Sequence, residues 1–590
     1  MLNQANPAQT LTFPVKKRKY SIRAIFWIVA ILLAAIQGWA NRYTLSSEDV
    51  ISYLDIGDAY LRGDWNNTIN GYWSPLYPWL LALTTSILKP STYWEFPVVK
   101  LVNILIYLFT LGCFDLFLRE LILYYSQKTS PDSNHKYLTI PEWVWLISGY
   151  SLFLWSSIKW TPIYSDAPDM CVAAIFYLAS WIVLRLQTRA ASWFNFISLG
   201  VVLGFGYLAK AAMFPLALVF LLVASFSGSD RRQTLSRVLI SFLIFTIIVS
   251  PFIAALSISK GRFTFGDNGK LNYVFYVNPG GYIIPDHHWQ GELPGSGTPK
   301  HPTRKIFDDP QVFEFATPLI GTYPIWYDPS YWYEGLKVKF NLKKQIILLK
   351  RNAINYIKLF LGGLLFVYLV LICTSGRFLL SVKALRENWI LLLPAAAELG
   401  MYMLVTDIEW ANLKLQPSTR YIAPFIVILF AGVFSSLRLP DFLKWKKLIA
   451  GITIVVATIV GCNLSVQASR DLVTLSQPIE HVQWQIASVV QSLGIRPGDK
   501  VAVFADEYEG ITPHVFWARL ARVKMVAEIP DGNSFWEKTD FVRSEVLKTI
   551  GKTGAKIILH LPKSKNPDYL PTDGWVKIKD TGYYAHLLQE

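Results

Sequence analysis

The chain has 590 residues, of which 53% are hydrophobic, 15% are aromatic and only 16% are charged, and its mean hydropathy is positive. This balance excludes an ordinary soluble globular protein and favours a chain that crosses a membrane several times. The formal net charge is +15, but Lys and Arg occur in short clusters beside apolar runs, which argues against a nucleic-acid partner. Cys113, Cys171, Cys373 and Cys462 show no CxxC spacing, so neither a disulfide framework nor a zinc site is indicated.

Apolar segments long enough to cross a bilayer follow one another through the first 470 residues. We predict about 11 transmembrane helices, near residues 22–41, 97–124, 142–158, 166–186, 193–208, 211–227, 236–258, 353–375, 389–406, 419–437 and 447–467. The stretch 75–88 is shorter and contains proline, so we expect a helix at the membrane surface or a re-entrant one. The first segment lacks a small-residue cleavage site, which favours an anchor over a removed signal peptide.

Basic residues in alternate short loops set the expected orientation, because Lys and Arg favour the cytoplasmic side. Residues 1–21 are then a cytoplasmic segment, and the loops 42–96 and 259–352 face outward. The expected location is the plasma (inner) membrane, with several passes and a functional face toward the periplasm or the cell exterior.

The composition becomes that of a soluble domain after residue 470. We therefore divide the chain into a transmembrane domain, 22–469, and an extracytoplasmic domain, 470–590. Strand and helix patterns alternate in the second part, which predicts a small parallel α/β domain. No glycine-rich phosphate-binding motif follows its first strand, so a nucleotide site has little support.

Acids and one arginine gather at the outer ends of separate predicted spans. Asp49 follows the first span, Asp166 and Asp169 lie at the outer start of the fourth, and Arg420 lies at the outer start of the tenth. If the first stretch is helical, Asp49 and Tyr53 share a face, Asp58 pairs with Arg62, and Asp55 points elsewhere. A structural interpretation stays open for each: the acids can cap helices, and Arg420 can reach to the lipid interface.

The order of several motifs resembles the GT-C superfamily of integral-membrane glycosyltransferases, in particular bacterial relatives of protein mannosyltransferases and aminoarabinose transferases. The motifs are "EDVISY", "GDWNNTINGYWSPLYPWLLAL", "YSDAPDMCVAAIFYLASWIVLRL" and "TRYIAPF", with a weaker match in "LGFGYLAKAAMFPLAL". The resemblance extends from about residue 20 to 465.

The resemblance implies a role for each matching residue. Asp49 would be the general base, Asp166 would position the acceptor or assist a metal, and Arg420 would hold the phosphate of a lipid-linked donor. Tyr421 would support Arg420, and Lys210 stands in the donor region where many relatives have arginine. The residues expected to contact the acceptor or the sugar are Tyr53, Tyr72, Trp73 and Asp169.

The chemistry of the expected reaction suits these residue types. When a sugar is transferred from a polyprenyl phosphate, the phosphate leaves as an anion that a guanidinium can stabilise, and the incoming hydroxyl needs a base. The expected function is therefore an inverting glycosyltransferase with a polyprenyl-phosphate sugar donor and a lipid, glycan or protein acceptor. No cofactor is assigned, and the need for a divalent metal stays open.

Two other functions stay open, a lipid or sugar transporter (flippase) and a non-catalytic protein that binds a lipid-linked sugar. A transporter is disfavoured because the predicted spans have few charges near their centres, although Glu398 is an exception whose role we leave open.

The long loop 259–352 adds residues that are harder to assign. Its possible metal ligands match no metal motif and are interpreted as a solvated loop: Asp286, His287, His288, His301, Asp308 and Asp309. The aromatic residues between 323 and 333 are interpreted as a belt at the membrane interface rather than as a surface for sugars.

Overall fold

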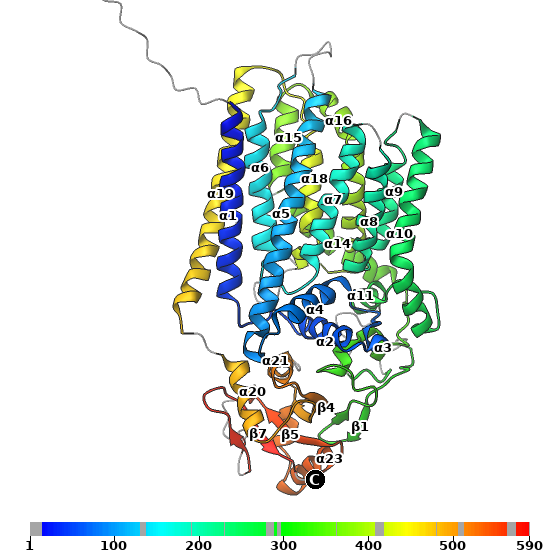
Figure 1. Ribbon diagram of the computed structural model, residues 1–590, viewed down its shortest axis with the longest axis vertical. Coiled ribbons are helices and arrows are strands. Elements are labelled where there is room, and N and C mark those ends of the chain that lie inside the picture. Colours follow the sequence, from blue (N-terminus) through cyan, green and yellow to red (C-terminus); the bar gives the residue numbers. More distant parts are fainter. Residues whose placement is uncertain are drawn as a thin grey trace, which may run out of the picture.

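Three layers of the molecule follow one another along its long axis (Figure 1). A bundle of long helices forms one end, short helices form the middle, and an α/β domain forms the other end. The computed structural model describes residues 15–129, 137–189, 192–228, 230–278, 288–291, 297–361, 363–407, 418–478, 481–505, 512–562, 571 and 574–588.

Helices of the bundle occupy every segment that the sequence predicts as a span. They are α1 (Val15–Ala40), α5 (Glu95–Lys128), α6 (Glu142–Trp155) with the π-helix η2 (Ser156–Trp160), α7 (Asp169–Thr188), α8 (Trp193–Ala209), α9 (Met213–Ala224), α10 (Arg231–Lys260), α14 (Leu342–Leu361), α15 (Leu364–Thr374), α16 (Phe378–Glu387), α17 (Trp389–Val405), α18 (Ala423–Phe434) and α19 (Leu443–Ser476). The molecule is thus mostly helical, as predicted.

Not every helix of the bundle is long enough to cross a membrane by itself. Within the described residues, five helices are long and apolar enough to cross a membrane, or up to seven if each of two bent pairs is one span. One bent pair is α14 with α15, at 65°, where we expected one straight span over 353–375. The count of about 11 stays a prediction, because α8, α9 and α18 are shorter apolar helices.

Close helix packing in the bundle depends on glycine. A Cβ atom on Gly200 of α8 would lie 2.5 Å from the carbonyl oxygen of Ser241 on α10. One turn later, a Cβ atom on Gly204 would lie 2.8 Å from the Cβ atom of Ile248. Two small residues four positions apart therefore let the two helix backbones approach each other, as is common in membranes.

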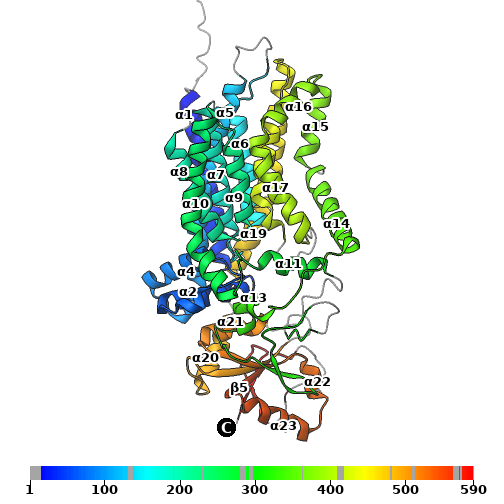
Figure 2. The same ribbon diagram turned by 90° about the vertical axis from the view of Figure 1, so that its right-hand side faces the viewer.

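Short helices form the middle layer. They are α2 (Asp49–Arg62), α3 (Trp65–Thr68), η1 (Thr92–Trp94), α4 (Leu76–Leu88), α11 (Asn268–Val277), α12 (Pro324–Tyr327), α13 (Pro329–Trp332) and η3 (Ser418–Tyr421). Both α2 and α4 lie across the end of the bundle (Figures 1 and 2). The stretch 75–88, expected as a surface or re-entrant helix, thus forms α4 in this layer.

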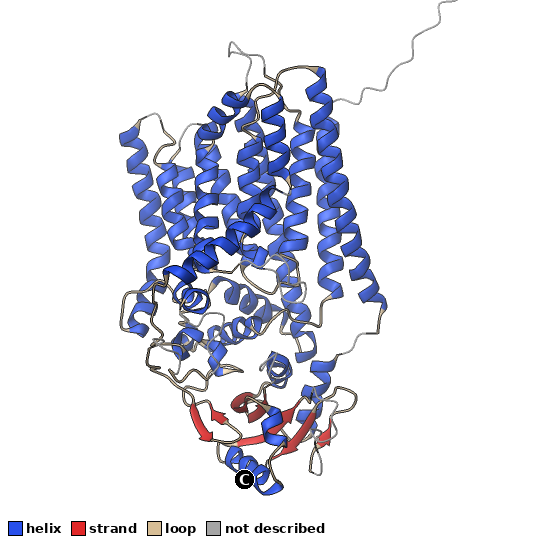
Figure 3. Ribbon diagram, turned by 180° about the vertical axis from the view of Figure 1, so that it is seen from behind, coloured by secondary structure: helices blue, strands red, loops and turns tan. Residues whose placement is uncertain are grey.

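A seven-stranded sheet forms the core of the third layer, the α/β domain, which we call the outer domain (Figure 3). Its order is β1 (Arg304–Phe307), β2 (Val312–Glu314), β4 (Lys524–Ile529), β3 (Lys500–Phe504), β5 (Ala555–His560), β7 (Tyr584–Leu587) and β6 (Val576–Lys577). The three central strands are parallel, as the alternating pattern predicts, and the outer strands pair antiparallel.

The sheet is not built from the C-terminal segment alone. Strands β1 and β2 come from the long loop 259–352, and Phe313 of β2 pairs with Glu528 of β4. The helices of this layer are α20 (Val482–Ser492), α21 (Thr512–Ala521), α22 (Gly532–Trp536) and α23 (Asp540–Gly551). Since α19 continues to Ser476, the proposed boundary at residue 470 falls inside a helix.

Candidate active site

Asp49 stands at the first position of α2, where the chain turns back under the bundle. Its Oδ1 accepts a hydrogen bond of 3.0 Å from the indole nitrogen of Trp326, and its Oδ2 lies 3.9 Å from a guanidinium nitrogen of Arg420. No side-chain hydrogen bond from Glu48 caps the helix. The side chains at this helix start therefore meet other parts of the molecule, which weakens the interpretation of a simple solvated cap.

Arg420 lies between two carboxylates. Besides facing Asp49, its Nε is 3.3 Å from Oδ2 of Asp169, the first residue of α7. Its other nitrogens donate to the hydroxyls of Ser165, at 3.3 Å, and Tyr421, at 3.1 Å. The guanidinium is therefore held on the α7 side and approaches Asp49 without a direct hydrogen bond.

Asp49, Arg420 and Asp169 form a row of charges. Lys210, which directly follows α8, extends this row. Its ammonium lies 2.8 Å from Oδ1 of Asp169 and 4.1 Å from the centre of the Tyr421 ring. Tyr421 in turn stacks on Tyr402, with ring centres 5.8 Å apart. The order Asp49, Arg420, Asp169, Lys210 alternates in sign, so the row is electrically balanced and holds both cations at the bundle end.

The two ends of this row are its accessible part. The side chains of Asp49 and Lys210 are each 20% exposed, whereas Arg420 is 10% and Asp169 only 4% exposed. A ligand that arrives at the bundle end can therefore reach the carboxylate and the ammonium first. Asp169 is the buried support between the two cations.

Burial raises the pKa of Asp49 above its ordinary value, and the charge of Asp169 adds to this effect. The nearby Arg420 and the hydrogen bond from Trp326 act in the opposite direction. Asp49 thus has the character of a carboxylate that holds a proton more readily than a solvated aspartate, which suits a group that must accept one.

Aromatic side chains form a wall beside Asp49. Tyr53 packs edge-on against Trp73 with ring centres 5.1 Å apart, and Tyr72 packs against Trp73 at 4.5 Å. Trp326 closes the group, 6.1 Å from Trp73. The structure therefore brings all three predicted aromatic contacts, Tyr53, Tyr72 and Trp73, next to the proposed base.

Asp166 has other partners than the row of charges. Its side chain is fully buried, and Lys100 of α5 lies 2.6 Å from both carboxylate oxygens. The amide of Asn103 and the backbone amide of Ser46 also donate to it, both at 2.9 Å. These contacts tie α5 to the chain before α2 and before α7, so the geometry gives Asp166 a supporting position.

Trp326 is a site residue that sequence reasoning missed. The aromatic group around it was interpreted as an interfacial belt, but four of its five other members are buried within the protein, Tyr323, Tyr327, Trp332 and Tyr333, while Tyr331 is partly exposed. The belt interpretation is wrong for these four side chains. The sequence signal was the density of aromatic residues, whose partner on α2 only the tertiary structure reveals.

The histidines of the long loop have structural partners. The His288 ring stacks on Phe313 and its nitrogens bond Thr303 and Glu528, while His301 stacks on Tyr331 beside Glu334. Asp309 pairs with Lys538 at 2.7 Å. Asp286 and His287 lie outside the described residues. Within those residues, no group of three His, Cys, Asp or Glu side chains could hold a metal ion.

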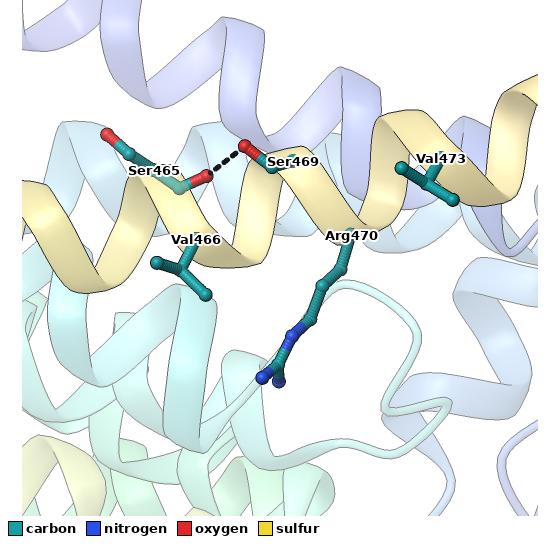
Figure 4. A pocket seen from close by; sticks show the side chains of 5 residues that line it. All are labelled: Ser465, Val466, Ser469, Arg470 and Val473. Atoms are coloured by element: carbon teal, nitrogen blue, oxygen red, sulfur yellow. Dashed lines mark hydrogen bonds between the residues drawn. The ribbon is translucent and has the colours of Figure 1, made fainter.

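Two hollows elsewhere contain none of the predicted site residues. One, of about 550 Å³, lies along α19 and is lined by Ser465, Val466, Ser469, Arg470 and Val473. Figure 4 shows Arg470 extending away from the helix there, while the Ser469 hydroxyl donates to the Ser465 carbonyl at 2.9 Å. The other, of about 880 Å³, is apolar and lies among α5, α6, α15, α18 and α19.

No protein-family model and no curated protein matches the chain. Among solved structures, it is similar to the oligosaccharyltransferase of Archaeoglobus fulgidus in the apo form, with 14% identity, 92% of this chain and 70% of that chain covered, and a TM-score of 0.49. It is also similar to ArnT from Cupriavidus metallidurans bound to undecaprenyl phosphate, with 12% identity, 98% and 99% covered, and a TM-score of 0.47.

Both proteins are GT-C superfamily glycosyltransferases, the class that the sequence motifs resemble.

Proposed function

We propose that the protein is an inverting glycosyltransferase that moves a monosaccharide from a polyprenyl-phosphate donor to an acceptor at the outer face of the plasma membrane. The observation that supports this most is the placement of Asp49 3.9 Å from Arg420 at the end of the helix bundle. A base and a phosphate-binding cation thus face each other at the position where a lipid headgroup would lie.

The cations of the row would bind the donor phosphate. Arg420 offers a planar fork for phosphate oxygens, and Lys210 adds a compact second charge next to Asp169. Because the polyprenyl phosphate leaves as an anion once the sugar is transferred, these charges stabilise the leaving group without a proton. Tyr421 keeps both cations in place through its hydroxyl and its ring.

Asp49 would accept the proton of the acceptor. The acceptor oxygen or nitrogen attacks the anomeric carbon, its proton passes to Asp49, and the bond from that carbon to the phosphate oxygen breaks. The bonding electrons stay on the phosphate, which Arg420 and Lys210 neutralise. Attack opposite the leaving group inverts the anomeric configuration. The partly exposed rings of Tyr72 and Trp326 would offer apolar surface for the sugar ring or the acceptor beside the base, and the buried rings of Tyr53 and Trp73 pack behind them.

Binding of undecaprenyl phosphate to the purified protein tests the donor site directly. We expect Arg420→Ala to weaken this binding about 10-fold to 100-fold, the value of a charged hydrogen bond. Arg304→Ala is the matched control, because Arg304 lies on β1 and its side chain is 69% exposed. Equal affinity of the Arg420 variant and the control would reject the phosphate site.

The same preparation separates the transferase from a transporter. In vesicles, a transferase releases free polyprenyl phosphate and a glycosylated acceptor, whereas a flippase moves the intact lipid-linked sugar between leaflets. Transbilayer movement of intact donor without any product would favour the transporter.

A further inference from the structure

The face of α2 that points away from the row of charges receives an arginine from the outer domain. Arg519 of α21 reaches Asp55 with one nitrogen at 2.6 Å and Asp58 with the same nitrogen at 2.7 Å. Its other terminal nitrogen lies 2.6 Å from Glu95, the first residue of α5. The side chain of Arg519 is only 4% exposed, so it is buried among three acids from two elements.

These contacts revise the expectation for the acids of α2. Asp58 was expected to pair with Arg62 on the same helix, but its ion pairs in the described residues are with Arg519 and Arg522. Asp55, which the helix geometry places on another face than Asp49, binds the outer domain. In α2, Asp49 thus belongs to the row of charges, whereas Asp55 and Asp58 bind Arg519 of α21.

Asp55 also binds the segment that contains Trp326. Its Oδ2 accepts the backbone amide of Thr322 at 2.6 Å, and its Oδ1 accepts the Thr322 hydroxyl at 3.1 Å. Four residues later, the carbonyl of Trp326 accepts from the Ser52 hydroxyl at 2.7 Å, while its indole donates to Asp49. The segment 322–326 therefore runs along α2 and is fastened at both ends.

The outer domain holds the same segment from its other side. The amide of Met525 at the start of β4 donates to the Thr322 carbonyl at 3.0 Å. Arg519 and Met525 belong to adjacent elements of this domain, α21 and β4. Helix α2 and the Trp326 segment are thus both bound to the same α/β domain.

We propose that Arg519 is a positioning residue that sets the place of Asp49 through α2 and the Trp326 segment. Its fork binds Asp55, Asp58 and Glu95 together and so joins α2 to the start of α5. Arg522 makes longer contacts with two of these acids, at 3.5 Å to Asp58 and 3.0 Å to Glu95. The cations of the donor site have separate supports, because Arg420 and Lys210 are anchored by Asp169 on α7 and by Ser165. Loss of Arg519 should therefore disturb the base and leave the phosphate site in place.

This inference rests on the proposed function for its catalytic consequence but not for its structural one. The first measurement is hydrogen exchange of the backbone amides of residues 49–62 in the purified full chain. In Arg519→Gln we expect exchange in α2 to be at least about tenfold faster, since open states of this helix become more populated. Arg543→Gln is the control, because Arg543 pairs with Asp540 on the surface of the same domain.

The second measurement separates catalysis from donor binding. We expect Arg519→Gln to lower kcat about 10-fold to 100-fold per folded molecule, while the Kd for undecaprenyl phosphate stays within about twofold. If Arg519→Gln does not fold, Arg519→Lys keeps the charge but not the fork. Thr322→Val is a milder variant, because it removes only the hydroxyl bond to Asp55.

Each result decides the proposal. Faster exchange in α2 with reduced kcat and unchanged Kd supports it, and partial recovery in Arg519→Lys strengthens it. Unchanged exchange, or faster exchange with normal kcat, overturns it, as does a loss of activity that only follows the folded fraction. If Asp49→Asn proved fully active, the proposed function would fail, while the exchange experiment would still test the tie between Arg519 and α2.

Discussion

Among single residues, Arg420 links several parts of the candidate site, because two carboxylates and two hydroxyls surround its guanidinium. The approach to Asp49, at 3.9 Å, is the loosest of these contacts. A donor phosphate could replace Asp49 as the neighbour of the guanidinium without breaking the closer contact to Asp169. The arrangement therefore keeps Arg420 oriented before and after a ligand binds.

Asp49→Asn is the sharpest test of the proposed base. We expect kcat for sugar transfer to fall about 10²-fold to 10⁴-fold, because the amide keeps the size and the Trp326 contact but cannot accept the proton. The variant should remain folded in the membrane and bind undecaprenyl phosphate normally. Full transfer activity would reject the role of Asp49.

The pH dependence of kcat follows from the raised pKa of Asp49. A base must be ionised, so activity should be present above this pKa and lost as the pH falls through it. The midpoint of the acidic limb should lie above the ordinary aspartate value of 3.8. In Arg420→Gln the opposing positive charge is gone, and the limb should move further toward neutral pH. A limb that stays in place would show that another group controls it.

On the level of elements, the contact of Lys100 with Asp166 joins α5 to the segments before α2 and α7. Both charges are almost fully buried, with exposures of 2% and 0%. Removing one partner of such a pair leaves the other charge buried and unpaired, whereas removing both charges is far better tolerated.

Lys100 and Asp166 variants distinguish a structural from a catalytic Asp166. We expect Asp166→Ala to lower the free energy of unfolding by about 3 to 5 kcal/mol. The double variant Lys100→Met with Asp166→Asn should recover much of that loss and retain sugar transfer. Thermal unfolding in detergent together with the transfer assay provides both quantities. If the stable double variant is inactive, Asp166 has the catalytic role that the resemblance implies.

For the molecule as a whole, the arrangement depends on which side of the membrane each layer faces. The expected orientation puts the α/β domain outside and the loop between α9 and α10 in the cytoplasm. Two substitutions at exposed positions test this, Lys577→Cys on β6 and Gln233→Cys at the start of α10.

An impermeant maleimide should label Lys577→Cys in right-side-out vesicles and Gln233→Cys only after the vesicles are opened. The two exposed native cysteines, Cys373 and Cys462, are replaced by alanine in both variants so that they do not react. The reverse labelling would place the row of charges on the cytoplasmic side and contradict the proposed use of an external donor.

Local sequence patterns predict where helices form and which residue types gather at one end of the molecule. Apolar length is a local property, so α1, α5, α7 and α10 could be predicted from composition along the chain. The parallel centre of the outer sheet also followed from local alternation. The closeness of Asp49, Asp169 and Arg420 was suggested by their common side, not by any local pattern, and Lys210 was indicated only by the resemblance.

Only the tertiary structure decided the partners of these side chains. Asp166 turns to Lys100, Asp55 to Arg519, and Trp326 to Asp49, across separations of 66, 464 and 277 residues along the chain. Strands β1 and β2 join a sheet whose other strands begin nearly 200 residues later. Such pairings depend on how whole elements pack, and a charged side chain takes whichever opposite charge burial brings near. For that reason the resemblance could indicate that Asp49 and Arg420 belong to one site, but the sequence did not indicate that Asp169 would be the nearer carboxylate to the guanidinium.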